Sequence, residues 1–164
     1  MPLMVATIYL QLDQSLADTA ISLAEALQVR KCERRESDHY GGEYFLLKGF
    51  GLRGHLYLNA EGQWDNELAK FACIFDIDFS FVSTDLDTFI IADTIAQYYA
   101  QFIAFQLGIE TCVVLPFEKT SGEIEYVRNV YKRNPAYDKT RPMEELVDLE
   151  LVVIEKVVVD QMET

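Results

Sequence analysis

Residues 73–81 read CIFDIDFSF, a run in which apolar and polar side chains alternate. Successive side chains of a β-strand point to opposite faces, so this pattern predicts a strand with one face in the core. Over residues 71–82 the expected core face carries Phe71, Cys73, Phe75, Ile77, Phe79 and Phe81. Asp76 and Asp78 fall on the other, wetter face, where residues two apart stand roughly 7 Å from each other. The role of these two carboxylates is the central question for function.

The residues before this strand predict a strand, a helix and a hairpin. Residues 5–12 alternate as a first strand, and residues 15–30 repeat apolar side chains every three or four positions, as an amphipathic helix does. Asp13 or Ser15 can cap that helix. Two further strands are expected at residues 43–48 and 52–60, the first opened by a turn at the paired glycines 41 and 42.

Gly49 and Gly51 lie between those two strands and Gly54 lies early in the second, and together they match the spacing G-x-G-x-x-G. A dinucleotide site with this spacing needs a helix after the glycines, because the helix N-terminus faces the phosphates. Here a strand follows instead. We therefore interpret KGFGLRG as a tight hairpin turn rather than a nucleotide site.

The residues after the central strand predict more helix. Residues 84–107 form a largely apolar stretch that Asp85 or Asp87 could cap and Gly108 could end. Asp93 and three glutamines argue against a membrane span, so we expect a central helix buried against the sheet. A short strand is expected at residues 109–117. The basic segment before Pro135 is interpreted as helical, and the ambiguous residues 143–162 are assigned to a helix in preference to a strand.

These elements predict one α+β domain spanning residues 1–164. Its sheet is expected to be antiparallel or mixed, with one long buried helix and flanking helices. A chain of 164 residues with 50% hydrophobic residues is large enough to bury a substantial core. We find neither an internal repeat nor a linker that would indicate a second domain.

The charge distribution bears on the partner. The net charge is −13, and residues 61–127 hold 12 of the 27 acidic residues against only Lys70 and Lys119. Such a surface repels phosphate backbones, which disfavours nucleic acid as a direct ligand. A basic protein would be attracted to it instead. The alternative is that the charge only keeps the protein soluble.

Two other features concern the compartment. The N-terminal MPLMVATIYLQL lacks the basic start and the small-residue cleavage site of a secretory signal, which favours a cytoplasmic location. Cys32, Cys73 and Cys112 are odd in number and widely spaced. This spacing predicts reduced thiols rather than disulfides or a structural zinc site.

The candidate site residues follow from the acidic block. A pair of carboxylates on a strand can hold Mg²⁺ in nucleotidyltransferases, but those enzymes also carry a Gly-Ser turn just upstream, and ELAKFACIFDID contains none. We therefore expect a site for a protein partner and assign no catalytic residue, metal or cofactor. The expected partner-binding residues are Tyr57, Trp64, Asp65, Glu67, Asp76, Asp78, Asp85 and Asp87. A small metal-dependent enzyme that uses Asp76 and Asp78 and a self-associating protein remain alternatives.

Residues 34–59, RRESDHYGGEYFLLKGFGLRGHLYLN, combine charged residues, a Tyr-Gly-Gly-x-Tyr-Phe turn and two expected strands. This stretch resembles small acidic immunity proteins of bacterial contact-dependent growth-inhibition systems. The resemblance implies a cytoplasmic protein that binds the C-terminal domain of one toxin and blocks its active site or substrate entry. It supplies no site residue that can be carried over to this chain.

Overall fold

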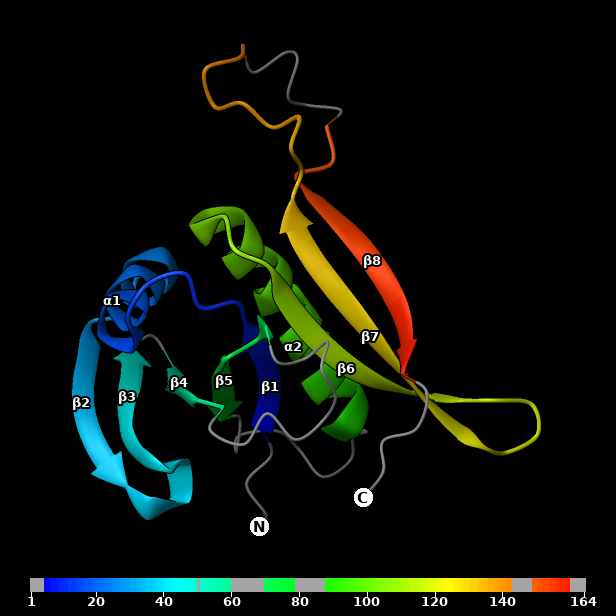
Figure 1. Cartoon of the computed structure of the whole chain (residues 1–164), viewed down its shortest axis with the longest axis horizontal. Coiled ribbons are helices and arrows are strands. Elements are labelled where there is room, and N and C mark those ends of the chain that lie inside the picture. Colours follow the sequence, from blue (N-terminus) through cyan, green and yellow to red (C-terminus); the bar gives the residue numbers. More distant parts are fainter. Residues whose placement is uncertain (1–4, 50, 60–69, 79–87, 143–148, 160–164) are drawn as a thin grey trace.

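The computed structural model describes residues 5–49, 51–59, 70–78, 88–142 and 149–159. Within these ranges the chain forms eight strands, two α-helices and one short 3-10 helix, η1. Their order is β1 (Val5–Leu10), α1 (Leu16–Leu27), β2 (Lys31–Ser37), η1 (Asp38–Tyr40), β3 (Gly42–Gly49), β4 (Leu52–Leu58), β5 (Cys73–Asp78), α2 (Thr88–Leu107), β6 (Thr111–Glu118), β7 (Ile124–Arg133) and β8 (Val152–Val159) (Figure 1).

The eight strands form one antiparallel sheet in the order β2-β3-β4-β5-β1-β6-β7-β8. Strand β1 joins the two halves, and Figure 1 shows them on either side of it. Its pairing with β5 runs along the whole strand, whereas its pairing with β6 is confined to Tyr9–Cys112 and Leu10–Thr111. The central strand of the fold therefore has its most extensive contact with β5.

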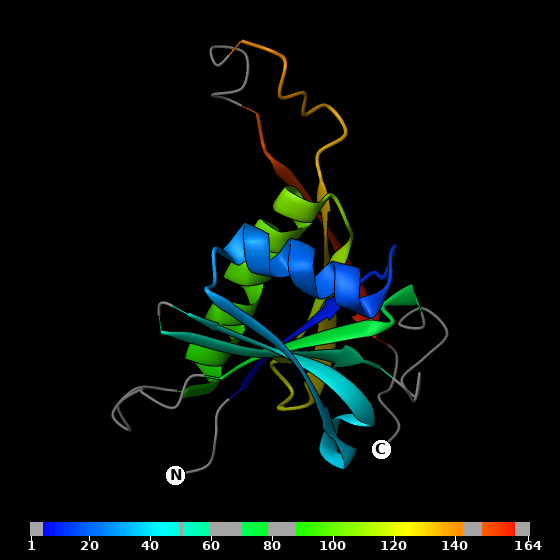
Figure 2. The same cartoon turned by 90° about the vertical axis from the view of Figure 1, so that its left-hand side faces the viewer.

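Both helices cover the same face of the sheet (Figure 2). Helix α1 contacts β2, β3 and β4, and α2 contacts β1, β6 and β7. One continuous core joins Leu23 of α1 and Ile103 of α2 to Ile8, Leu56 and Phe75 of the sheet, all fully buried. Because side chains alternate along each strand, the residues between these core positions point to the opposite, helix-free face.

The strand predicted from CIFDID is confirmed as β5, with Cys73, Phe75 and Ile77 buried in the core. Asp76 and Asp78 lie on the helix-free face, as the alternation predicted. Residues 79–82 of the predicted strand lie outside the described residues. The hairpin interpretation of KGFGLRG is also confirmed, since β3 and β4 pair on either side of it and Gly51 has a φ of +81°.

The two α-helices begin and end close to the predicted residues. The hydroxyl of Ser15 caps α1 by accepting a hydrogen bond from the Asp18 amide at 3.1 Å. Helix α2 ends before Gly108, whose φ of +67° suits the left-handed position after a helix. The predicted caps Asp85 and Asp87 lie outside the described residues. None of the helices in the described ranges is long and apolar enough to cross a membrane.

The predicted fold class is wrong. The described chain is mostly an eight-stranded antiparallel sheet with two α-helices on one face, not a helix-rich α+β domain with flanking helices. The antiparallel sheet and the long helix are present as expected, whereas the flanking helices assigned to the C-terminal third are strands in the described residues. Three segments cause the difference. Residues 31–37 received no prediction and form β2, and the basic segment expected as a helix forms β7. Of residues 143–162, assigned to a helix, Val152–Val159 form β8.

The physical reason differs between these segments. Strand β2 lies at the sheet edge, and its charged side chains gave no apolar alternation to detect. In β7, Val130 and Tyr131 are buried on opposite faces, so both faces are partly covered and the alternation disappears. In β8 the valines favour a strand, and pairing with β7 along its whole length outweighs the helical spacing of a few residues.

Candidate functional site

The candidate site lies on the helix-free face, where β4, β5 and β1 run side by side. Asp76 of β5 is directly opposite Thr7 of β1 and His55 of β4. Asp78 is opposite Arg53 of β4. Directly opposite residues in an antiparallel pair have side chains on the same face about 5 Å apart. The strand register therefore places two carboxylates, a hydroxyl, an imidazole and a guanidinium together.

Asp76 is held by two hydroxyl groups. Thr7 Oγ1 donates to Asp76 Oδ1 at 2.7 Å, and Tyr57 Oη donates to Asp76 Oδ2 at 2.6 Å. Burial nevertheless raises the pKa of Asp76 above its ordinary value, because the two hydrogen bonds offset only part of the cost of desolvating the carboxylate. The pKa of the Tyr57 phenol is raised by burial and by its bond to Asp76. Asp76 is thus fixed in position within the sheet.

Asp78 is less enclosed. Its Oδ2 lies 3.6 Å from His55 Nδ1 and 3.8 Å from Arg53 Nε, and its side chain is 16% exposed. His55 is 7% exposed, and its Nδ1 makes no hydrogen bond to any described residue. Burial lowers the pKa of His55, which favours the neutral imidazole despite the nearby Asp78. At neutral pH Asp78 therefore faces the half-exposed guanidinium of Arg53 as its one charged counterpart in this group of described residues.

Tyrosine rings surround the acidic pair. Helix η1, capped by Ser37, places Tyr40 against His55 in a stacked arrangement with a centroid distance of 5.1 Å. The Tyr40 ring also lies 4.5 Å from the ring of Tyr44 and 4.8 Å from that of Tyr57. Burial raises the pKa of Tyr40, and the charges of Asp78 and Asp76 add to the increase. The three tyrosines therefore form a partly exposed aromatic layer beside the carboxylates.

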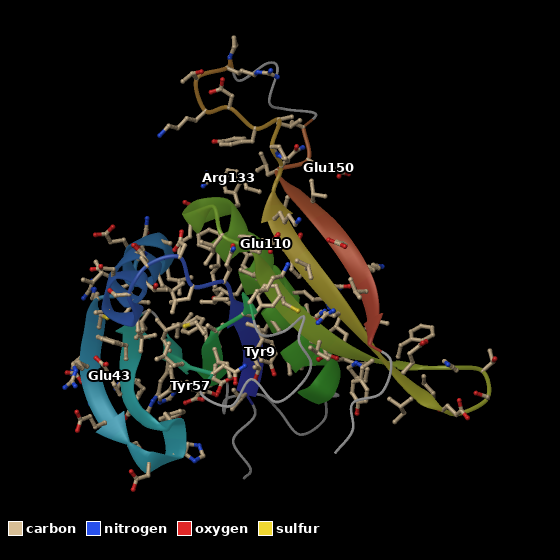
Figure 3. All side chains as sticks on the ribbon, in the orientation of Figure 1. Tyr9, Glu43, Tyr57, Glu110, Arg133 and Glu150 are labelled. Carbon is tan, nitrogen blue, oxygen red and sulfur yellow. The ribbon has the colours of Figure 1, made fainter. Side chains whose placement is uncertain are left out.

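The same face continues across β1 to β6 and β7. Tyr9 packs on a small apolar cluster formed by Phe71, Cys112 and Val130, and Figure 3 shows Tyr9 over the centre of the sheet. Beyond Tyr9, the carboxylate of Glu110 forms ion pairs with Lys70 and Lys132, with an N–O distance of 2.9 Å in each. Burial alone would raise the pKa of Glu110, but the two lysines together outweigh burial, so the pKa of Glu110 is lowered. This part of the face is apolar or already paired, so the acidic and aromatic character is concentrated at β4 and β5.

We define the acid–tyrosine cluster as Tyr40, Tyr44, Arg53, His55, Tyr57, Asp76 and Asp78. It contains three of the predicted site residues, Tyr57, Asp76 and Asp78. The other five, Trp64, Asp65, Glu67, Asp85 and Asp87, lie outside the described residues. Sequence reasoning missed the involvement of Tyr40 and Tyr44 and the contact with Thr7. Their proximity depends on strand register, and alternation within β4 alone does not determine that register.

The geometry gives little support to a metal site. Among the described residues no group of three or more His, Cys, Asp or Glu side chains is arranged to hold a metal ion. Both oxygens of Asp76 accept hydrogen bonds from hydroxyl groups of the protein, and Asp78 Oδ2 is directed toward two nitrogen groups. A metal at this pair would have to displace those contacts.

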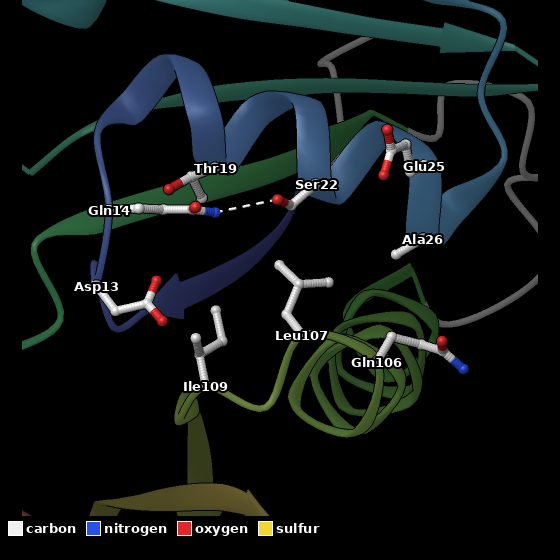
Figure 4. A pocket seen from close by; sticks show the side chains of 9 residues that line it. All are labelled: Asp13, Gln14, Thr19, Ser22, Glu25, Ala26, Gln106, Leu107 and Ile109. Atoms are coloured by element: carbon white, nitrogen blue, oxygen red, sulfur yellow. Dashed lines mark hydrogen bonds between the residues drawn. The ribbon is translucent and has the colours of Figure 1, made fainter.

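A separate pocket of about 520 Å³ lies between α1 and the end of α2. Figure 4 shows the carboxylates of Asp13 and Glu25 at opposite ends of the pocket, with Gln14 Nε2 donating to Ser22 Oγ at 3.0 Å between them. Leu107 and Ile109 form its apolar floor. The lining offers no nucleophile paired with a base, so this pocket is not our candidate site.

Comparison with known proteins adds no assignment, since no protein-family model, no curated protein and no solved structure matches this chain.

Proposed function

We propose that this protein is an immunity protein: a cytoplasmic binding protein that neutralises a cognate, basic toxin domain by occluding its active site or its substrate entry. The partner contacts the acid–tyrosine cluster, with Lys and Arg side chains directed toward Asp78 and the tyrosine rings. No catalytic residue, metal or cofactor takes part in this function.

The observation that carries the proposal is the composition of the cluster. Tyr40, Tyr44 and Tyr57 provide rigid, partly exposed rings beside two carboxylates, and Tyr is enriched among the residues that dominate binding energy at protein interfaces. Cations are attracted both to carboxylates and to the faces of aromatic rings. The cluster therefore suits basic side chains, and the net charge of −13 would increase the rate at which a basic domain arrives.

The internal contacts of the cluster favour binding over catalysis. Asp76 is fixed by Thr7 and Tyr57, and the pocket between α1 and α2 lies on the opposite, helix-covered side of the sheet. An enzyme using Asp76 and Asp78 would need a substrate-sized hollow beside them, and neither of the two hollows described for the placed residues is lined by either carboxylate. A preorganised surface that binds a protein needs no such hollow, because side chains of the partner contact the surface directly.

The proposal is tested in two steps. The tagged protein is used to capture partners from its source cells, and each captured basic polypeptide is then expressed alone and together with this protein. We expect one polypeptide that stops growth when expressed alone and is harmless when this protein is present. If every captured polypeptide is harmless alone, or if co-expression gives no protection, the proposed function is wrong.

Matched charge variants test the site. Asp78→Lys reverses a charge in the cluster, whereas Glu25→Lys makes the same change at an exposed position of α1, on the other side of the sheet. Protection should be lost in the first variant and kept in the second. Equal effects of the two variants would mean that net charge, rather than this cluster, determines recognition.

A further inference from the structure

The two edges of the sheet differ in how they are protected. Strand β2 carries a network of ion pairs, with Glu33 contacting Lys31 at 2.8 Å and Arg35 at 2.7 Å, and Arg34 contacting Glu36 at 3.0 Å. Charged side chains on an edge strand oppose the addition of another strand. Strand β8, at the opposite edge, has only Glu155 and Lys156 as charged residues among its eight.

Strand β8 exposes apolar residues to solvent and, among the described residues, has a strand partner on one side only. Within the described part of the chain it pairs with β7 alone, so one side of its backbone has no strand partner there. Val153 is 42% exposed and Ile154 is 48% exposed, and the adjacent Leu151 is 41% exposed. A long apolar edge of this kind is a site for strand addition.

A hollow beside β8 can receive the side chains of an added strand. It has a volume of about 550 Å³ and lies between α2 and the start of β8. Its lining includes Tyr98, Phe102 and Phe105 from α2, together with Val152 and Ile154 from β8. Every second side chain of a strand laid along β8 would point to the helix-covered side, next to this hollow. Apolar side chains at those positions would cover Ile154 and the exposed ring of Tyr98.

A second copy of this chain fits the edge poorly. Directly opposite residues of two antiparallel strands point to the same face. When a twofold axis relates two copies of one strand, the opposite residues are therefore an even number of positions apart, and the axis passes through a residue that is opposite its own copy. Centring on Glu155 places two Glu155 carboxylates opposite each other, and centring on Lys156 places two ammonium groups opposite each other. Like charges directly opposite destabilise a strand pair. Registers centred elsewhere pair fewer residues of β8.

We propose that the free edge of β8 binds an extended segment of a different protein by antiparallel strand addition. The segment carries a basic residue opposite Glu155, an acidic residue opposite Lys156, and apolar residues on the side of the hollow. This inference is independent of the proposed function, because β8 and the acid–tyrosine cluster belong to opposite halves of the sheet.

Two synthetic peptides of identical composition test the proposal. In Val-Thr-Val-Glu-Lys-Val-Thr-Val, Glu is placed opposite Lys156 and Lys opposite Glu155 when the peptide runs antiparallel to β8. In the control, Val-Thr-Val-Lys-Glu-Val-Thr-Val, the same register places like charges opposite each other. Both carry the same flexible Gly-Ser tail, and each is titrated into the full-length ¹⁵N-labelled protein while backbone amide signals are followed.

We expect the amides of β8 and of the lining of the hollow to shift with the first peptide. Its affinity should exceed that of the control by about three- to thirtyfold, since two cross-strand charge pairs change from attractive to repulsive. The double variant Glu155→Lys/Lys156→Glu should reverse the preference. Asp78→Lys should leave it unchanged, which separates this test from that of the proposed function.

Three results would overturn the proposal. The first is the absence of β8 shifts at millimolar peptide, and the second is equal affinity for the two peptides in the wild-type protein. The third is a change in the β8 amide signals when the protein is concentrated in the absence of peptide, accompanied by a dimer in sedimentation. That result would make a second copy of the chain the occupant of the edge.

Discussion

Tyr57 Oη donates a hydrogen bond of 2.6 Å to Asp76 Oδ2 across the β4–β5 pair. This bond joins β5, which carries Asp76 and Asp78, to β4, which carries Arg53, His55 and Tyr57. Thr7 makes the equivalent bond from β1 at 2.7 Å, so Asp76 connects three adjacent strands on the helix-free face. We infer that Asp76 positions the cluster, while Asp78 is the carboxylate available to a partner.

Removing this hydroxyl should destabilise the protein. Tyr57→Phe leaves a half-buried carboxylate with one donor fewer, and a hydrogen bond to a charged group contributes about 1.5–3 kcal/mol. The free energy of unfolding in urea should fall by that amount. Tyr98→Phe is the control, because the Tyr98 side chain is 64% exposed and its ring contacts only Tyr99 among the aromatic contacts described. A loss in the control equal to that of Tyr57→Phe would contradict the account.

The cluster also predicts a pH dependence. The folded-state pKa of Asp76 is raised above its ordinary value of 3.8, so Asp76 contributes stability when protonated and loses it as the pH rises through the raised pKa. Asp76→Asn cannot ionise. The stability of the wild type relative to Asp76→Asn should therefore decrease as the pH is raised from 3.8 through the raised pKa and then become constant. Urea unfolding of both proteins over this range provides the measurement, and an increase with pH would contradict the raised pKa.

The sequence predicted β5 and the orientation of its carboxylates because the alternation in CIFDID is strong and one face is fully buried. It could not predict which side chains meet Asp76. That depends on the pairing of β5 with β1 and β4, and their contacts join residues 69 and 19 positions apart in the chain. Alternation assigns a residue to a face, whereas strand order and register decide its neighbours.

The fold class was wrong for a related reason. Residues 152–159 satisfy both a helical spacing and a β-prone composition, and local pattern alone could not distinguish the two. The register with β7, from Arg133–Val152 to Tyr126–Val159, is a tertiary contact that favours the strand. In β2, ion pairs to neighbouring side chains take the place of apolar alternation, so no periodic signal marks that strand.

Gly54 is expected to tolerate no larger side chain. A Cβ at this position of β4 would overlap the ring of Phe75, which is fully buried on the neighbouring strand. Gly54→Ala should lower the free energy of unfolding by about 1–3 kcal/mol, as overpacking of a core does. In the double variant Gly54→Ala/Phe75→Leu the smaller side chain relieves the overlap. The loss of unfolding free energy in the double variant should therefore be smaller than the sum of the losses in the two single variants. Simple additivity in urea unfolding would contradict this packing.

Thiol labelling should distinguish the three cysteines. Cys32 is exposed at the β2 edge, whereas Cys73 and Cys112 are buried. Burial raises the pKa of Cys73 to about 12, which further suppresses its reactive thiolate. A chromogenic disulfide reagent should modify one thiol per chain in the native protein and three in denaturant. Rapid native labelling of a second thiol would contradict the burial of these strands.

The central claim is that the acid–tyrosine cluster recruits a basic partner. Reversing both Asp76 and Asp78 would not test it cleanly, because Asp76 also holds Thr7 and Tyr57 in place. The direct measurement is the association rate of the captured partner with wild type, Asp78→Lys and Glu25→Lys as the salt concentration is raised. We predict slower association of wild type with increasing salt, a large decrease for Asp78→Lys at low salt, and near wild-type rates for Glu25→Lys. A rate that is insensitive to salt and equal in all three proteins would contradict the claim.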